Sequence, residues 1–197
     1  MEEQRRVRVL PGPDSGMLRL LDRETYDPVV VSLEASTPRL ADVHPGYLLD
    51  ATLDWSAPEP PVDDITVQRP TLYTFVDEID PVFEVAQDVW QEARASGDGM
   101  NSRVTRNTDG DANGVCYVFA EPPLEDRLAE FREGARPLEP LIDRVNETSD
   151  TAPREVFVMR PTDGEFVVVT IAFEKEGHFA DTLRETYSCE RPPEPLG

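Results

Sequence analysis

Lysine is almost absent from this chain of 197 residues: Lys175 is the only one, and every other basic side chain is an arginine. Acidic side chains outnumber basic ones by 40 to 19, which gives a formal net charge of -21. Such an excess of like charge destabilises a compact state at ordinary ionic strength, but at about 1 M salt the screening length falls to about 3 Å. A lysine stem exposes apolar methylenes, whereas the arginine fork suits ion pairs. We therefore expect a halophile-adapted cytoplasmic protein whose carboxylates hold hydrated salt cations at the surface.

Long apolar runs and cysteines are also scarce. No stretch approaches the roughly 20 apolar residues of a membrane helix, and the charged N-terminus does not resemble a signal peptide, so no membrane association is expected. Cys116 and Cys189 are too few for a disulfide framework. No Cys or His pair has zinc-ligand spacing, and no nucleophile elbow, P-loop or dinucleotide fingerprint is present. We expect neither a bound metal nor a cofactor, and the sequence does not decide whether the protein is an enzyme.

The first third of the chain reads as short strands separated by turn signals. Residues 1–55 therefore predict a small, antiparallel, barrel-like sheet. The proline-rich, acidic stretch 56–64 predicts an exposed linker. The expected strands cover residues 5–10, 17–22, 29–33 and 47–55.

Residues 65–188 mix helical and strand periodicity, so the fold class is expected to be α+β. This part should contain an antiparallel sheet with two to three packed helices. Asp80 and Pro81 have the signature of a helix start, and Gly97 that of its end. Residues 189–197 are expected to form a flexible tail. The further strands are expected at 65–68, 72–76, 102–106, 115–120, 155–160 and 166–173, and the further helices at 123–145, restarted at Pro137 and Pro140, and near 179–187.

The densest set of varied polar side chains lies in residues 101–114, between two predicted strands. Part of it, Asp109-x-Asp111-x-Asn113-Gly114, matches the opening of a calcium loop, but the twelfth position is Ala120 instead of an acidic ligand. Metal binding is therefore not expected. Two interpretations remain open: a hairpin loop closed by residues that tolerate left-handed backbone, or a site for an anion, a small ligand or a partner. The candidate binding residues are Asn101, Arg103, Arg106, Asn107, Asp109 and Asp111.

Two resemblances follow from these features. In composition and layout the whole chain resembles the uncharacterised small acidic proteins of haloarchaea. Residues 4–76, with their paired hairpins and the Pro45-Gly46-Tyr47 lead into a long strand, resemble an oligonucleotide-binding (OB) barrel. The aromatic residues on these predicted strands serve either as core residues or as a platform on which bases stack. They are Tyr47, Trp55, Tyr73 and Phe75.

These resemblances imply a non-enzymatic binding module whose partner is RNA, a ribonucleoprotein or a protein. The alternative is a small-ligand-binding protein or an enzyme with its site on the 101–114 hairpin loop. Net charge does not separate the two, because every soluble protein of a salt-filled cytoplasm is acidic.

Overall fold

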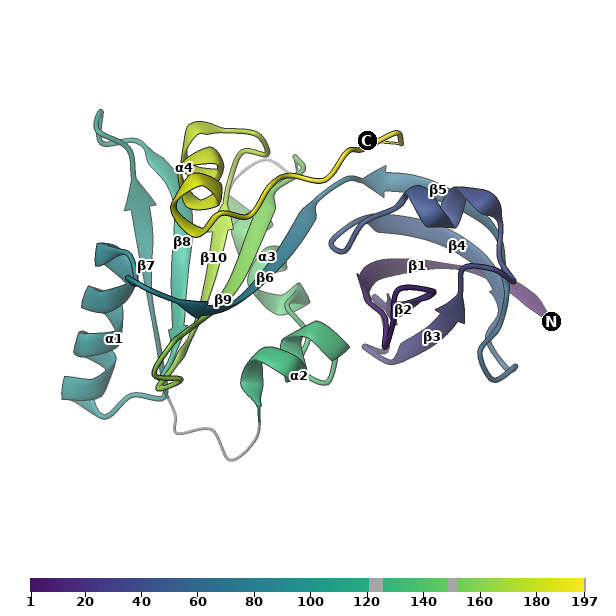
Figure 1. Ribbon diagram of the computed structural model, residues 1–197, viewed down its shortest axis with the longest axis horizontal. Helices are drawn as coiled ribbons and strands as arrows, with labels where there is room; N and C mark the ends of the chain where they lie inside the picture. The colour runs from purple at the N-terminus through teal and green to yellow at the C-terminus, as the bar shows by residue number, and fades with distance from the viewer. Residues whose placement is uncertain (121–125, 149–151, 197) are drawn as a thin grey trace.

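The computed structural model describes residues 1–120, 126–148 and 152–196. They form two five-stranded sheets, which lie in two halves along the long axis of the molecule (Figure 1). Four α-helices belong to the second half, which confirms the α+β class. No helix among the described residues is both long enough and apolar enough to cross a membrane.

The first sheet is antiparallel, with the order β3-β2-β1-β4-β5. Three hairpin-connected strands followed by a fourth that returns beside the first make a Greek key. Each predicted strand is present. Their bounds are Glu2–Pro11 (β1), Met17–Asp22 (β2), Pro28–Ser32 (β3), Leu48–Asp54 (β4) and Val62–Arg69 (β5).

This sheet is not closed into a barrel, contrary to the barrel-like arrangement expected from the sequence. The chain after β3, including a 3-10 helix at Pro38–Asp42, lies against β5 in place of a strand ladder. The backbone N–H of Thr37 donates to the carbonyl of Val62 at 2.8 Å, and the Val62 N–H donates to the hydroxyl of Ser36 at 2.9 Å. These bonds satisfy the backbone of Val62, at the start of β5, without a contribution from β3.

The predicted linker at 56–64 ends earlier than expected. Residues 62–64 already belong to β5, which pairs with β4, and Val62 is buried in the core of the first sheet. The three prolines at 58, 60 and 61 all precede this strand, so they do not interrupt its ladder. The first sheet therefore extends to Arg69, not to residue 55.

The second sheet has the order β6-β9-β10-β8-β7. Because β6 and β9 are parallel, it is mixed, not purely antiparallel as predicted. Strand periodicity and turn residues show which consecutive strands form antiparallel hairpins. They do not show how β6 joins the sheet, because its partner β9 is distant in the sequence. The bounds are Leu72–Ile79 (β6), Met100–Arg106 (β7), Ala112–Phe119 (β8), Glu155–Pro161 (β9) and Val167–Ala172 (β10).

Helices cover both faces of the second sheet. One face packs against α1 (Glu84–Ser96) and α4 (His178–Tyr187), the other against α2 (Arg127–Glu133) and α3 (Glu139–Thr148). The predicted helix start at Asp80 and Pro81 was wrong, since α1 begins at Glu84, although it ends at Gly97 as expected. The restart near Pro137 and Pro140 is confirmed by the break between α2 and α3. Residues 123–125 of the predicted helix lie outside the described residues.

The two halves share a core. Leu10 and Leu21 of the first sheet pack with Leu128 and Phe131 of α2 in one apolar cluster. The segment after α4, expected to be a flexible tail, instead runs back over β6 towards the first sheet (Figure 1). There Leu196 packs against the first-sheet core. The chain thus crosses between its halves more than once.

Candidate functional site

Two of the predicted site residues on β7, Asn101 and Arg103, face the neighbouring helix. Arg103 pairs with Glu92 of α1, and its other terminal nitrogen lies 3.7 Å from Asp88. The amide of Asn101 donates weakly to the Val89 carbonyl at 3.5 Å. Both side chains therefore fasten α1 to the sheet edge.

The remaining predicted site residues lie at the tip of the β7–β8 hairpin. Arg106 donates to the carbonyl of Gly110 at 2.9 Å. The Asn107 carbonyl oxygen accepts the backbone N–H groups of Asp109 and Asp111, both at 3.0 Å. The six candidates thus form two separate groups, because the odd spacing of Arg103 and Arg106 places them on opposite faces of the strand.

A small hollow lies beside the hairpin tip. Its volume is about 180 Å³, which is below the size typical of ligand pockets. Thr105 donates to the Asn113 side chain at 2.7 Å and so orients that amide near the hollow. The lining residues are Asn107, Ala112, Asn113, Phe173, Glu174, Gly177, His178 and Phe179.

A larger hollow, of about 560 Å³, lies on the first sheet. Trp55, which follows β4 in the β4–β5 loop, lines one side, and the guanidinium carbon of Arg5 lies 4.9 Å from the centre of its ring. The indole is only partly buried, whereas Tyr47 and Tyr73 are core residues. Of the aromatic residues considered from the sequence, Trp55 is therefore the one that lines this hollow.

Carboxylates surround the Trp55 hollow. They come from Glu3, Asp22, Asp27 and Asp54. Asp22 anchors Arg5 through a 3.0 Å ion pair, and hydrogen bonds from Ser56, together with the chain's terminal ammonium, lower the pKa of Asp54 to about 2. The hollow therefore combines one fixed guanidinium, one aromatic face and several carboxyl groups that can accept hydrogen bonds.

Glu139, at the start of α3, is fully buried where the two halves meet. It accepts from Arg8 of β1 at 2.8 and 3.0 Å, from Arg23 at 2.6 Å and from the Tyr73 hydroxyl at 3.1 Å. Burial alone would raise the pKa of this carboxyl, but Arg8 and then Arg23 hold it below its usual value. Its four donor contacts make it a fastening group without a free lone pair for a substrate.

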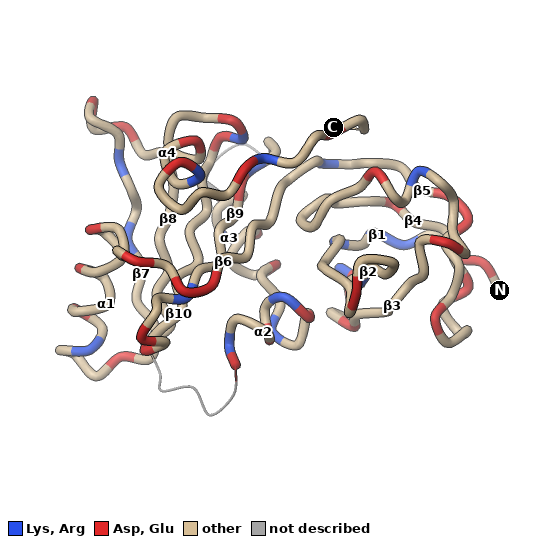
Figure 2. Tube along the Cα trace, in the orientation of Figure 1, with Lys and Arg blue, Asp and Glu red and all other residues tan. Residues whose placement is uncertain are grey.

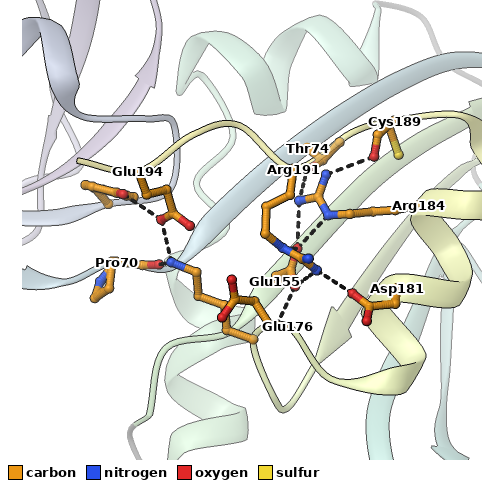
Figure 3. A network of polar contacts seen from close by, with 11 residues as sticks. Pro70, Thr74, Glu155, Glu176, Asp181, Arg184, Cys189, Arg191 and Glu194 are labelled. Carbon is orange, nitrogen blue, oxygen red and sulfur yellow. Dashed lines mark hydrogen bonds and ion pairs between the residues drawn. The ribbon is translucent and has the colours of Figure 1, made fainter. Parts of the chain in front are cut away.

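Glu155, at the start of β9, is the second fully buried carboxylate. It accepts from Arg184 of α4 at 2.7 Å, from Arg191 at 2.7 Å and from the Glu176 N–H at 2.8 Å (Figure 3). Arg191 also donates to Asp181 at 2.8 Å. This network holds the segment after α4 against the second sheet.

The only lysine of the chain continues this fastening to the first sheet. Lys175 donates to the Pro70 carbonyl at 2.7 Å and pairs with Glu194 (Figure 3). Glu194 also accepts from the Tyr47 hydroxyl at 2.6 Å, and the Pro193 carbonyl lies 2.7 Å from a ring nitrogen of His44. A groove of about 760 Å³ runs beside these contacts, but its cationic groups are engaged by carboxylates of the chain itself.

Thiols and imidazoles do not gather into a site in the part of the chain that the structure describes. There, no three His, Cys, Asp or Glu side chains form a group that could hold a metal ion. Cys116 is buried in β8, and burial raises the pKa of its thiol to about 12. It is therefore a core residue.

Sequence reasoning missed both buried carboxylates. The signal that could have found them is a charged residue within or beside an apolar strand: Arg8 interrupts Val7-Arg8-Val9-Leu10, and Glu155 opens Val156-Phe157-Val158-Met159. A charge at such a position requires a partner. Among 40 acidic residues, however, the sequence does not show which carboxylate supplies it.

Comparison with known proteins identifies a family but no characterised relative. Residues 1–192 match the model of a family of unknown function, DUF6663, so the chain belongs to this family. No curated protein and no solved structure matches it.

Proposed function

We propose that this member of the family is a non-enzymatic binding module that holds single-stranded RNA, alone or within a ribonucleoprotein, in the Trp55 hollow of the first sheet. The observation that carries the proposal is the Arg5–Trp55 pair beside an open Greek-key sheet. Partly open, five-stranded Greek-key barrels are the architecture of OB domains. Aromatic faces combined with arginine are the usual platform for stacking bases.

The carboxylates around the hollow are compatible with a base in it. Ionised Asp and Glu side chains accept hydrogen bonds from exocyclic amino groups of bases, so Asp27 and Asp54 favour bases that carry such a group. Phosphates would lie outside the hollow, away from these charges. At multimolar salt the counterion-release contribution to nucleic-acid affinity is small, so stacking and base-edge contacts would dominate there.

The two tryptophans provide a direct test, because Trp90 stacks on Phe166 in the other half of the molecule. Trp90→Phe leaves Trp55 as the only indole, and Trp55→Phe leaves Trp90. Short single-stranded RNAs titrated at about 2 M KCl, where charges are screened within ~2–3 Å, should quench the fluorescence of the Trp90→Phe variant alone. Trp55→Ala should weaken binding about 5- to 100-fold, the range for loss of one base stack, with an unchanged melting midpoint.

The RNA proposal is wrong if no RNA binds to the wild-type protein, or if Trp55→Ala binds as well as Trp90→Phe does. A pull-down at the same salt, with co-purified nucleic acid and proteins identified, would show whether the partner is a protein instead.

A salt-filled cytoplasm is the proposed working environment. Acidic side chains occur over both halves of the molecule (Figure 2), and the net charge is -21. Circular dichroism should show the midpoint of unfolding falling as KCl decreases from multimolar to about 0.1 M, where the screening length is about 10 Å. Equal stability at both concentrations would contradict adaptation to salt.

A second candidate function is the binding of a small polar ligand at the hairpin tip. It is favoured by the hollow beside Asn107 and Asn113, which His178 also lines. Asn107→Ala should abolish binding of such a ligand, whereas Arg103→Ala, which faces α1, should leave it intact. Screening a panel of small anions and metabolites by thermal shift, with both variants in parallel, tests this alternative.

A further inference from the structure

Strand β7 forms an outer edge of the second sheet, on the side away from the first sheet (Figure 1). Within the described ranges it is hydrogen-bonded to β8 along one side, and no strand pairs with its other side. It contains neither proline nor lysine, two residues that commonly protect sheet edges from pairing.

The register shows which backbone groups of β7 face outward. The Gly99 carbonyl accepts from the Ala120 N–H, so odd-numbered residues up to 105 face β8 in this antiparallel ladder. The even-numbered residues Met100, Ser102 and Val104 therefore direct their N–H and carbonyl groups outward. Consistent with this, the Ser102 N–H donates to the side chain of Asn101 instead of to a strand.

The same residues expose apolar side chains. Met100 is 42% exposed and Val104 is 45% exposed, and both belong to the small set of large apolar side chains at the surface. They lie opposite Phe119 and Val115 in the β8 register, so they extend the apolar face of the second sheet to its edge. Asn101 and Arg103 point to the opposite face, towards α1.

The edge is complementary to itself. If two copies of β7 pair antiparallel about Ser102, Met100 of each copy lies opposite Val104 of the other. Ser102 then lies opposite Ser102, and all outward backbone groups of this stretch find partners. Just before β7, Asp98 is held to the end of α1 by a hydrogen bond from its N–H to the Ala93 carbonyl. In this pairing it would approach Arg106 of the other copy, and both residues are exposed.

We propose that β7 is a dimerisation edge, through which a second copy of this chain joins the second sheet with Ser102 on the two-fold axis. Apolar residues meet on both sides of Ser102, and opposite charges approach each other at both ends. This arrangement is the isologous contact expected of a two-fold dimer. The proposal is independent of RNA binding, because the Trp55 hollow lies in the other half of the molecule.

Among the described strands, two other edges have comparable length, β5 and β6, and both are less suited to self-association. On β6, Asp77 and Glu78 are exposed neighbours. On β5, Asp63 and Asp64 are exposed neighbours, so a second copy of either strand would bring like charges together. Charge complementarity thus favours pairing through β7.

The oligomeric state of the full-length protein tests this proposal. Sedimentation velocity over a wide concentration range, at about 2 M KCl to screen the net charge, should show a monomer–dimer equilibrium. Val104→Glu puts a carboxylate opposite the apolar Met100 at two places in the contact, so a charge is desolvated on each side of Ser102, and it should raise the dissociation constant at least ~10-fold. At concentrations where the wild type and this variant are both monomeric, circular dichroism and the melting midpoint should be the same for the two, because Val104 is at the surface.

A charge exchange tests the register, in a buffer of about 0.5 M KCl where contacts between surface charges are less screened. Arg106→Asp and Asp98→Arg should each weaken the dimer about 3- to 10-fold, and the double variant should restore it to within about 2-fold of wild type. A wild-type protein that stays monomeric, or a dimer that Val104→Glu does not weaken, would overturn the dimer edge. A dimer that the double variant does not restore would overturn pairing about Ser102.

Discussion

Glu139 and Glu155 are both fully buried and both bound by two arginines, yet they join different parts of the molecule. The partners of Glu139 come from the first sheet, from the chain just after β2 and from β6. Those of Glu155 all come from the second half, including the segment after α4. The same kind of ion pair therefore joins the two sheets at Glu139, whereas at Glu155 it holds the segment after α4.

The two sites differ in the hydrogen-bond acceptors that the arginines would keep if the carboxylate were removed. Arg8 is 1% exposed, and its other hydrogen bond goes to the carbonyl of Gly46. Arg191 keeps Asp181, and Arg184 keeps the Thr74 hydroxyl and the Cys189 carbonyl. Loss of Glu139 thus leaves the buried Arg8 with a single carbonyl acceptor, whereas loss of Glu155 leaves Arg184 with two neutral acceptors and Arg191 with a carboxylate.

The largest expected effect is that of Glu139→Gln. Removing the charge partner of a buried arginine costs about 3–5 kcal/mol, so the free energy of unfolding should fall by that amount in denaturant titrations at constant KCl. A loss below about 1 kcal/mol would mean that Arg8 is not dependent on this carboxylate.

Glu155→Gln should have a smaller effect. We expect a loss of about 2–3 kcal/mol, in the range of a few hydrogen bonds to charged groups, because both arginines keep other acceptors. Hydrogen exchange should become faster in the segment 189–196. If Glu155→Gln costs more than Glu139→Gln in the same titration, the comparison between the two carboxylates is wrong.

The pH dependence of stability provides a further test of Glu139→Gln. Folding lowers the pKa of Glu139 from 4.5, so its stabilisation is fully present above the pKa of the unfolded chain and is lost as the pH falls through the lower folded value. The difference in stability between wild type and Glu139→Gln should therefore be constant from neutral pH down to about 5 and then shrink. A difference that grows towards acid pH would contradict the sign of this shift.

The smallest expected effect is that of Arg103→Ala, which removes an exposed ion pair of the same composition. Surface pairs contribute about 0.2–1 kcal/mol, and this contribution should decrease with added KCl, unlike that of the buried pairs. Denaturant titrations at two KCl concentrations measure both. A salt-independent loss above about 2 kcal/mol would show that Arg103 does more than hold α1.

The sequence predicted elements where the pattern is local. The hairpins β7–β8 and β9–β10 and the end of α1 at Gly97 follow from strand periodicity, turn residues and a left-handed cap, all of which are read within a few neighbours. The parallel pairing of β6 with β9, the extension of the first sheet to Arg69 and the packing of residues 189–196 depend on contacts between distant segments. No local pattern encodes them.

Candidate site residues were harder to predict for a related reason. Residues 101–114 were predicted as a candidate site because they carry many different polar groups. In the structure Asn101 and Arg103 bind α1, and Asn107 closes a turn. Trp55 was considered among the aromatic residues, but only the structure separates it from the buried Tyr47 and places it beside Arg5. The pairing of Arg8 with Glu139 spans 131 positions and cannot be read from either neighbourhood.

The distance in sequence between Arg8 and Glu139 also determines how long the nascent chain lacks this contact during translation. At about 5–20 residues per second, Glu139 follows Arg8 out of the ribosome after roughly 7–26 s. For most of this interval the nascent first sheet carries Leu10 and Leu21 without the α2 side chains that cover them in the finished molecule. We expect the emerging chain to be most prone to aggregation, and most dependent on chaperones, between translation of residue 69 and translation of residue 139.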